Sequence, residues 1–363
     1  MTRAVELAQV ASAGVSEAFK NRIINGAMVI DQRNAGAAVS TDNSFPVDRY
    51  NFRTVGGGVI SFQRSTTAPA GFINSLAATV TTADASIAAS DNYQLRQTIE
   101  GFNIADLGWG TANAATVTLS FWVRSSLTGT FGGNLVNYAA NRSYVFQYTI
   151  SAANTWEQKS ITIAGDITGT WSTDNSGGIT VTWDLGSGTD FNGTTANIWA
   201  ASNFRRISGN VQLVSTNGAT FYITGVQLEV GSSATSFEYR QYGTELALCQ
   251  RYYYRLKSTA TNYPFGVAQC YGATSAGALI PYPVTMRTAP SALEQSGTAG
   301  DYQVYTSTGG NAVCTSVPVY AGILTTTAYG AVNFTVGSGI VAGNMTAATG
   351  NNSTAYLGWS AEL

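Results

Sequence analysis

Short stretches in which apolar and polar residues alternate recur along most of the chain, and this pattern constrains the fold more than any other feature. Within residues 116–124, Val117, Leu119, Phe121 and Val123 fall on one face of an extended strand. Gly, Asn and Ser residues separate such stretches, as is typical of antiparallel sheets. Similar stretches occupy residues 21–33, 45–53, 59–64, 94–100, 144–150, 156–163, 179–185 and 211–214. The pattern predicts a mainly β chain whose first part is an antiparallel, jelly-roll-like β-sandwich.

The stretch from Phe221 to Tyr254 combines two periods. It begins as an alternating strand, and the alternation slips at Gly225, which predicts a bulge. From Thr244 onward apolar residues recur at helical spacing, which predicts a short linker helix. More strand-like stretches follow, so we expect a second, C-terminal β domain. The predicted division is a short N-terminal helical segment (residues 1–20), a β-sandwich (21–242), a linker helix and joint (243–257) and a C-terminal β domain (258–363).

Residues 2–20 are the one long helix-compatible stretch in the sequence. They are rich in alanine, and Ala8, Ala11, Val15 and Ala18 share one helical face. An isolated helix of this length is marginal in water. We therefore expect it to have a partner, either copies of the same segment or a larger assembly. A frayed terminus is the alternative.

The composition excludes several classes of protein. Charged residues make up 10% of the chain, against about 25% in typical soluble domains, and the net charge of −2 offers no basic surface for nucleic acid. Cys249, Cys270 and Cys314 have no motif spacing, which indicates reduced thiols and synthesis in a cytosol. Residues 1–20 lack an apolar h-region, and no apolar run is long enough to span a membrane, so we expect neither a signal peptide nor membrane insertion. Asn, Ser, Thr and Gly take the place of charged residues, as on the surfaces of extracellular β proteins. Such a surface without an export signal fits a virion protein that is assembled in a host cytoplasm and released by lysis.

Four segments occur in an order that matches a known family: residues 19–34, 47–50, 225–231 and 245–253. With these segments the chain resembles the tail fibre proteins of tailed bacteriophages, especially those that infect cyanobacteria and other marine bacteria. The resemblance implies a carbohydrate-binding-module-like sandwich on a homotrimeric appendage of the virion tail. It also implies attachment to a tail or adaptor protein through the N-terminus, and recognition of host surface polysaccharide or lipopolysaccharide at the far end.

Two sets of apolar residues are expected to serve this assembly. The linker helix and the residues after it would pack against symmetry mates and form the trimer joint. The N-terminal segment would contact the virion protein that holds the fibre. The candidates for the trimer joint are Leu246, Leu248, Cys249 and Tyr252, and those for virion attachment are Leu7, Val10, Val15 and Phe19.

Aromatic residues among Asn, Thr and Gly are the candidates for sugar binding, because aromatic faces pack on the C–H patches of sugars while amides bond to their hydroxyls. Most of them lie in the C-terminal domain, and Trp171 and Trp199 are candidates in the first. The alternative for each is packing in the core or in the trimer interface. The C-terminal candidates are Tyr302, Tyr305, Tyr320, Tyr329 and Trp359, with Asn311 and Asn351 as polar partners.

Catalysis has weak support in the sequence. The chain has no histidine, which excludes His-based triads and His metal sites, and no cofactor is expected. A glycosidase needs two converging carboxylates, so a tail-borne polysaccharide depolymerase remains an alternative, as does a purely structural connector or decoration protein. The acidic candidates are Glu100, Asp106, Glu157, Asp166, Asp174, Asp184 and Asp190. Asp184, Asp190 and Asn192 are weak candidates for a Ca²⁺ site, and a turn with Asx hydrogen bonds is the favoured interpretation.

Overall fold

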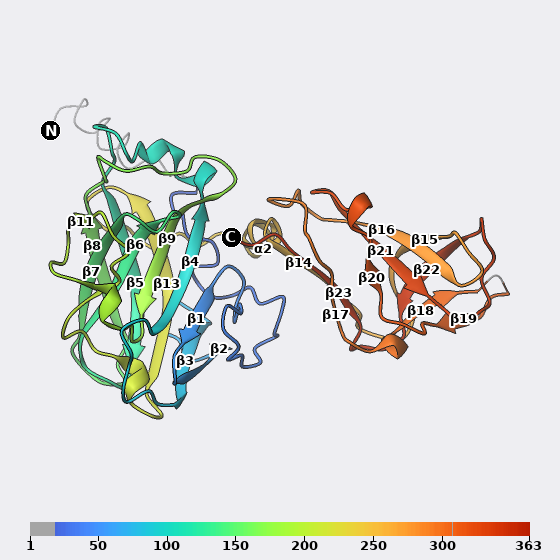
Figure 1. Cartoon of the computed structure of the whole chain (residues 1–363), viewed down its shortest axis with the longest axis horizontal. Helices are drawn as coiled ribbons and strands as arrows, with labels where there is room; N and C mark the ends of the chain where they lie inside the picture. Colours follow the sequence, from blue (N-terminus) through green and yellow to red (C-terminus); the bar gives the residue numbers. More distant parts are fainter. Residues whose placement is uncertain (1–18, 307) are drawn as a thin grey trace, which may run out of the picture.

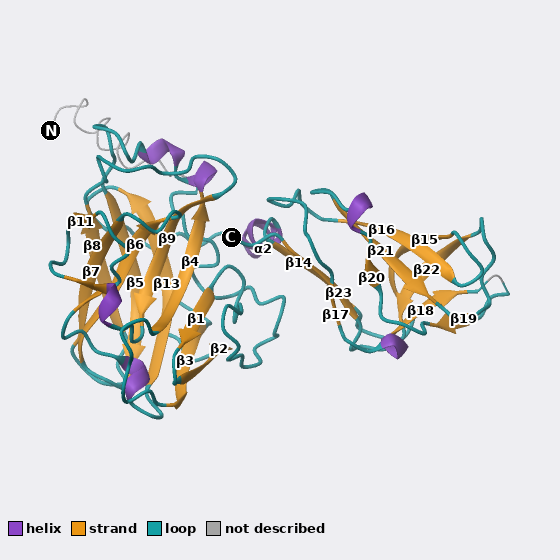
Figure 2. Ribbon diagram, viewed as in Figure 1, coloured by secondary structure: helices purple, strands orange, loops and turns teal. Residues whose placement is uncertain are grey.

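The computed structural model describes residues 19–306 and 308–363, which fold mainly as antiparallel β-sheets (Figure 1). Figure 2 shows strands in both halves of the molecule and helix α2 (Tyr242–Gln250) between them. The predicted mainly β fold with a short linker helix is therefore confirmed. Residues 1–18 of the predicted N-terminal helical segment (1–20) lie outside the described residues, and with them Leu7, Val10 and Val15. Phe19 is 55% exposed, and its part in virion attachment stays a prediction.

Two antiparallel sheets face each other in the first half of the chain. The six-stranded sheet runs in the order β1 (Asn51–Val55), β4 (Asn92–Glu100), β9 (Gly177–Asp184), β6 (Gly129–Asn137), β7 (Ser143–Ile150) and β11 (Trp199–Ala200). The five-stranded sheet runs in the order β2 (Val59–Ser65), β3 (Ser75–Thr82), β13 (Thr220–Val230), β5 (Val117–Ser125) and β8 (Glu157–Ile163). Strands β10 (Asn192–Gly193) and β12 (Arg206–Ile207) form a small parallel pair. The expected β-sandwich is present.

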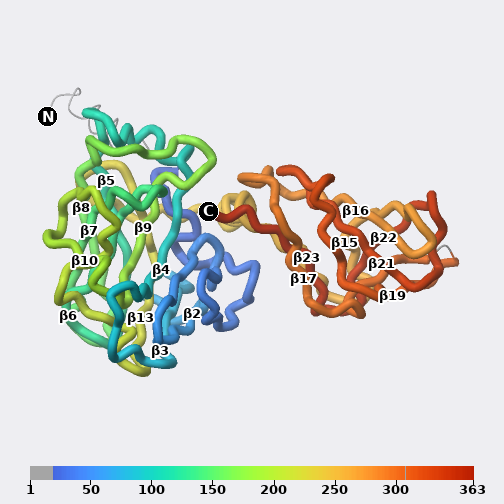
Figure 3. Tube along the Cα trace, in the orientation of Figure 1, coloured from blue at the N-terminus to red at the C-terminus, as the bar shows by residue number. Residues whose placement is uncertain are grey.

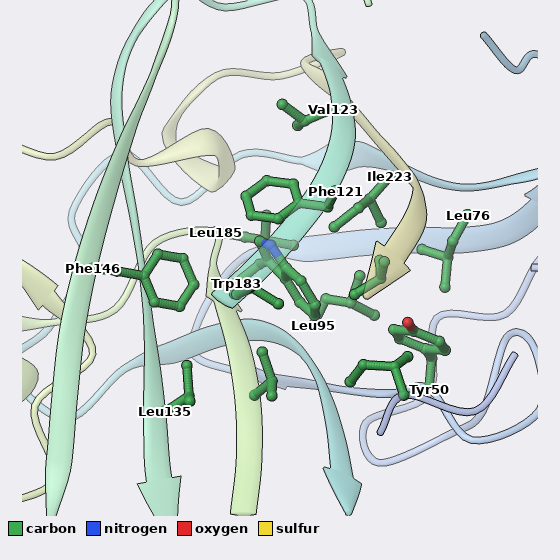
Figure 4. Close-up of a cluster of buried hydrophobic side chains, with 14 of the residues drawn as sticks. Tyr50, Leu76, Leu95, Phe121, Val123, Leu135, Phe146, Trp183, Leu185 and Ile223 are labelled. Atoms are coloured by element: carbon green, nitrogen blue, oxygen red, sulfur yellow. The ribbon is translucent and has the colours of Figure 1, made fainter. Parts of the chain in front are cut away.

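The core of this sandwich is built around aromatic side chains from both sheets (Figure 4). Trp183 of β9 is fully buried, and its ring meets Phe121 of β5 edge-on with 5.6 Å between centroids. The ring centroid of Tyr50 lies 6.4 Å from that of Trp183. Apolar residues alternate with polar ones along β5 and β9, so burying one face of each strand joins the sheets.

Gly225 forms the predicted bulge in β13. The pairing of β13 with β5 shifts register between Thr224 and Gln227, and Gly225 adopts a φ of 61°. A Cβ at this position would lie 2.6 Å from Cζ of Phe72, so both the conformation and the space require glycine. The bulge keeps the apolar residues on either side of it facing the core.

Two of the predicted strands do not form. Residues 21–33 run beside β13, with the Arg22 amide donating to the Leu228 carbonyl, but they are not a strand. Asn25 has a φ of 60° and its side chain bonds to the backbone of Ile30, which turns the chain. Residues 211–214 lead into a 3₁₀ turn, η4 (Leu213–Ser215). The other 3₁₀ turns are η1 (Gly101–Asn103), η2 (Ala105–Leu107), η3 (Thr189–Phe191), η5 (Ala299–Asp301) and η6 (Gly322–Leu324).

The second half of the chain forms two further sheets with a separate hydrophobic core. The three-stranded sheet has the order β14 (Tyr253–Lys257), β23 (Tyr356–Ser360) and β17 (Glu294–Gln295). The seven-stranded sheet has the order β19 (Asn311–Val313), β18 (Tyr302–Tyr305), β22 (Met345–Gly350), β15 (Tyr263–Cys270), β16 (Ser275–Pro281), β21 (Tyr329–Thr335) and β20 (Val319–Tyr320).

The joint between the two halves is packed within a single chain. Cys249 of α2 and Tyr252 are fully buried in a small cluster with Ile24 and Ile30. This corrects the expectation that Cys249 and Tyr252 form a trimer contact, because their side chains are already covered by the chain's own N-terminal loop. Leu246 and Leu248 are half-buried beside the same cluster, and their part in a trimer stays a prediction.

The C-terminal segment returns to this joint, as Figure 3 shows by the end of the red trace. The carboxylate of Glu362 pairs with Arg49, and it lies 3.4 Å from Nη1 of Arg33. The Ala361 amide donates to the Tyr252 carbonyl over 2.7 Å. The joint therefore brings together residues from the start, the middle and the end of the described chain.

The three cysteines are buried and unpaired, which confirms the expectation of free thiols. Among the described residues, no helix has the length and apolar character needed to cross a bilayer.

Candidate functional site

A groove of about 200 Å³ lies on the outer face of the six-stranded sheet. We call it the sheet groove. Its floor comes from the neighbouring strands β4 and β9. Its walls come from the β6–β7 turn, the C-terminal residue and the loop of residues 201–205 between β11 and β12, which we call the covering loop. The lining residues are Gln94, Arg96, Thr98, Val136, Asn137, Tyr138, Ala140, Thr180, Thr182, Asn203, Arg205 and Leu363.

Strand alternation places the floor residues. Leu95 of β4 and Val181 of β9 point into the core, so their neighbours point outward. The register pairs Arg96 with Thr182, and one step further along the hydroxyls of Thr98 and Thr180 lie 2.9 Å apart. The floor is therefore a row of hydroxyl, amide and guanidinium groups.

One wall is a loop that folds over the other half of the same sheet. The side-chain amide of Asn134 donates to the Phe204 carbonyl over 2.7 Å, and the Phe204 amide donates to the Ser143 hydroxyl over 3.0 Å. These bonds fix Asn203 and Arg205 at the edge of the groove. Because β6 and β7 are covered, the groove is confined to β4, β9 and their neighbours.

The other wall carries an exposed aromatic ring. Tyr138 follows β6, and its side chain is 53% exposed. The ring packs directly on Gly177 at the start of β9, where an added Cβ would lie 2.2 Å from Cδ2 of Tyr138. Because residue 177 has no side chain, one part of the Tyr138 ring packs on its backbone, and the rest of the ring stays exposed to solvent. An aromatic ring beside a row of polar groups is suited to binding a sugar, which has apolar C–H faces and a hydroxyl rim.

The acidic residues singled out in the sequence are mostly engaged in local contacts. Glu100 accepts from Arg251 and Tyr252, Asp166 pairs with Arg142, and Glu157 pairs with Lys159. Asp106 pairs with Arg22, and Asp174 accepts from Ser176. Arg142 and Thr168 hold the pKa of Asp166 below its usual value despite burial, and Arg251 and Tyr252 do the same for Glu100.

Asp184 is fully buried beneath the covering loop. Its Oδ1 accepts from the Ser187 amide over 3.0 Å, which agrees with the expected turn with Asx hydrogen bonds, and its Oδ2 lies 3.7 Å from Nε of Arg206. A guanidinium in this position disfavours a bound cation, so the weak Ca²⁺ candidate formed by Asp184, Asp190 and Asn192 is corrected. Among residues 19–306 and 308–363, no group of three or more His, Cys, Asp or Glu side chains is placed to hold a metal ion.

Burial of Asp184 produces a testable pH dependence. Burial raises the pKa of Asp184 to about 6 from 3.8, so the folded protein holds this proton more tightly than the unfolded chain does. Stability conferred by the proton is present below pH 4 and is lost as the pH rises towards 6. Between pH 5 and 7 we expect the deprotonation of Asp184 to lower the free energy of unfolding by about 1 kcal/mol. Urea unfolding of Asp184→Asn should show a fall smaller by this amount, and a fall equal to that of the wild type would refute the assignment. Asp48, whose pKa burial also raises to about 6, should contribute its own fall in both proteins.

The structure divides the predicted C-terminal sugar-binding residues. Tyr302 and Trp359 are fully buried in the second core, which corrects their assignment, since neither ring can face a sugar. Tyr320 and Tyr329 are half-buried, and the Tyr320 hydroxyl donates to the Pro290 carbonyl. Asn351 is half-buried and its side-chain amide donates to the Gly300 carbonyl over 2.8 Å.

Tyr305 and Asn311 do come together. They are opposite each other in the β18–β19 ladder, both are exposed, and the Asn311 amide donates to Asn262 over 2.8 Å. Tyr305 also lines a hollow of about 180 Å³. This tip patch, Tyr305 with Asn311 and Asn262, stays a prediction for a second sugar contact.

Trp171 and Trp199 pack with Trp109 in one cluster of mutually perpendicular rings, with centroids 4.8 to 5.3 Å apart. Each indole N–H donates to a backbone carbonyl. These contacts support the packing alternative for both residues.

Comparison with known proteins gives only distant similarities. No family model matches the sequence, and no curated protein matches it. The enzymatically active domain of tailspike protein 4 from bacteriophage CBA120 matches with a TM-score of 0.31 and 10% identity, over 58% of this chain and 22% of that chain. The present chain therefore spans less than a quarter of the tailspike's length.

Sugar-binding proteins match at a similar level. The family 11 carbohydrate-binding module of Clostridium thermocellum, solved with a mixed-linked β-1,3-1,4 tetrasaccharide, has a TM-score of 0.28 and 11% identity over 57% of this chain and all (100%) of that chain. A protein from Bacteroides thetaiotaomicron described as sugar-binding has a TM-score of 0.33 and 12% identity over 58% of this chain and 100% of that chain. Similarity at this level assigns no function to the present chain.

Proposed function

We propose that this chain is a receptor-binding tail fibre protein of a bacteriophage, which attaches the virion to polysaccharide or lipopolysaccharide on the host surface. The observation that carries the proposal is the sheet groove, where the exposed ring of Tyr138 stands beside the polar floor of β4 and β9. The resemblance of four sequence segments to tail fibre proteins supports the virion role. The proposal includes attachment to the tail through residues 1–20 and assembly in the host cytoplasm.

Tyr138→Ala is expected to weaken binding of the full chain to host cells, or to their purified surface polysaccharide, by about tenfold or more, because a central aromatic anchor is lost. Gly177→Ala should weaken binding too, because its Cβ displaces the ring while every groove side chain remains. Tyr271→Ala is the matched control, since Tyr271 is 58% exposed in the second half of the chain. The readout is a dissociation constant from biolayer interferometry. Unchanged binding by both groove variants would rule out the sheet groove as the receptor site.

We propose that attachment is not catalytic. Several acids that a depolymerase would need are held by arginine, lysine or backbone groups, as described above, and this supports adhesion over cleavage. Incubating the purified chain with host polysaccharide should release no reducing ends above a heat-treated control. Release at a catalytic rate would establish the depolymerase alternative.

Trimer formation is part of the proposal, since several weak sites on one particle gain avidity through effective concentration. The outer face of the seven-stranded sheet carries three exposed apolar side chains that suit such contacts. Val267 of β15, Leu279 of β16 and Met345 of β22 are 63%, 52% and 68% exposed. Apolar side chains gathered on one sheet face are typical of interfaces between copies.

Leu279→Asp is therefore expected to shift the protein towards monomers in multi-angle light scattering. Its unfolding midpoint in the monomer should change little, because the side chain is exposed. Thr259→Asp adds the same charge at an exposed position away from this face and is the control. A trimer of normal mass for Leu279→Asp would show that copies associate through another surface, such as that near Leu246 and Leu248.

A further inference from the structure

The sheet groove contains two arginines that lack an acidic partner. Arg96 rises from the floor; its Nε donates to Asn51 over 2.8 Å and its Nη2 to Asn43 over 3.2 Å. Both acceptors are neutral amide oxygens. Within residues 19–306 and 308–363, neither Arg96 nor Arg205 takes part in an ion pair.

Arg205 is the more unusual of the two. Its guanidinium carbon lies 3.7 Å from the centre of the Phe191 ring, so the group packs on that ring. Its Nη1 is buried and has no hydrogen-bond partner among the described residues. A buried N–H of a charged group normally has an acceptor, because leaving it unpaired costs more than the bond itself contributes.

The nearby acids are already used by other arginines. Asp42 accepts a hydrogen bond from Nε of Arg53 over 3.1 Å, and Asp184 forms an ion pair with Arg206. Among the side chains around the groove, two acids therefore face four arginines, so positive charge is in excess. Burial lowers the pKa of Arg205 to about 10; Asp184 opposes the shift, and Arg96 and Arg53 add to it by repulsion. A bound anion would relieve that repulsion.

We propose that the receptor is an acidic polysaccharide, and that Arg96 and Arg205 together hold one of its carboxylate or sulfate groups while Tyr138 packs on the adjoining sugar ring. This inference rests on the proposed function and specifies the chemical class of the ligand. A planar guanidinium fork matches two oxygens of a carboxylate or sulfate, and a charge-assisted pair is stronger than a bond between neutral groups. Packing on Phe191 orders the Arg205 side chain in the absence of a ligand.

The test compares probes that share a backbone and differ in charge. Dextran sulfate and dextran form one such pair, and polygalacturonate supplies carboxylates in place of sulfates. The full chain should bind at least one of the charged probes about tenfold more tightly than dextran at low salt, with the preference falling as salt is added. Which charged probe binds identifies the anionic group.

Arg96→Gln and Arg205→Gln should each lower affinity for the charged probe about tenfold, as expected for loss of a charge-assisted bond. Arg124→Gln is the matched control. It removes the same charge from β5, in the opposite sheet, where Arg124 lies over Tyr222 and donates to the Asn154 carbonyl. An equal loss for Arg124→Gln would mean that the charge preference is non-specific, and would overturn the inference.

Host polysaccharide separates this inference from the proposed function. If Tyr138→Ala loses binding while Arg96→Gln and Arg205→Gln keep it, the groove is the receptor site and the acidic ligand is refuted. If all three variants keep it, both proposals fail. Loss in all three, with Arg124→Gln normal, is the expected result.

Discussion

Replacing Trp183 with alanine is expected to lower the free energy of unfolding of the sandwich by about 3–5 kcal/mol, the largest effect of any single substitution in this core. Trp183 of β9 is fully buried, close to Phe121 on the opposite sheet and to Tyr50. Its removal leaves a cavity that rigid neighbouring strands cannot close. Urea unfolding monitored by circular dichroism measures the loss.

Trp183→Phe should cost clearly less than Trp183→Ala. The indole N–H of Trp183 has no partner among the described residues, so the substitution breaks no hydrogen bond and removes only part of the volume. Trp122→Ala is the matched control, because Trp122 lies on the outer face of β5 and is half-buried. If Trp122→Ala and Trp183→Ala cost the same, the core is not organised around Trp183.

Glu362→Ala is expected to have the second large effect, a loss of about 3–5 kcal/mol in the stability of the joint. The side chains of Glu362 and Arg49 are 6% and 2% exposed, and Arg33 lies close to the same carboxylate. Truncating the acid leaves the Arg49 guanidinium buried between the Thr98 carbonyl and the Tyr252 ring without a countercharge. Removing one partner of a buried pair is costly for this reason.

A double variant separates the charge effect from loss of packing. Arg49→Met with Glu362→Leu removes both charges, and it should be more stable than Glu362→Ala alone. Asp106→Ala tests an exposed pair, since Asp106 is 57% exposed beside Arg22, and should cost no more than about 1 kcal/mol. A double variant as unstable as Glu362→Ala would mean that the Glu362 side chain acts by shape and not by charge.

Much of the strand pattern could be predicted from sequence, because alternation reports which face of a strand is buried. The alternation of β5, the slip at Gly225 and the change of period before α2 all have direct structural counterparts. Strand β6 (Gly129–Asn137) was missed because Gly132 and Gly133 are typical of turns. Gly133 sits within the sheet, where an added Cβ would lie 2.4 Å from the Phe146 ring.

The sheet groove was beyond the reach of a linear pattern. Its residues run from Gln94 to Leu363, and they meet only through the register of β4 with β9 and the fold of the covering loop. Alternation does mark Thr180 and Thr182 as outward-facing, yet it gives no sign that Arg96 lies opposite Thr182. For two of the aromatic candidates the prediction was wrong. Tyr302 and Trp359 have polar neighbours in the sequence, which suggested exposure, but strands distant in the sequence bury them.

The return of the C-terminal segment to the joint has a mechanical consequence. Two antiparallel strands, β14 and β23, lead from the joint into the second half of the molecule, and they are paired from Tyr253–Ser360 to Lys257–Tyr356. A single linker strand would let the far half swivel freely. A paired ribbon anchored at both of its near ends resists twisting. A rotation of the far half is therefore transmitted to the sandwich as torque.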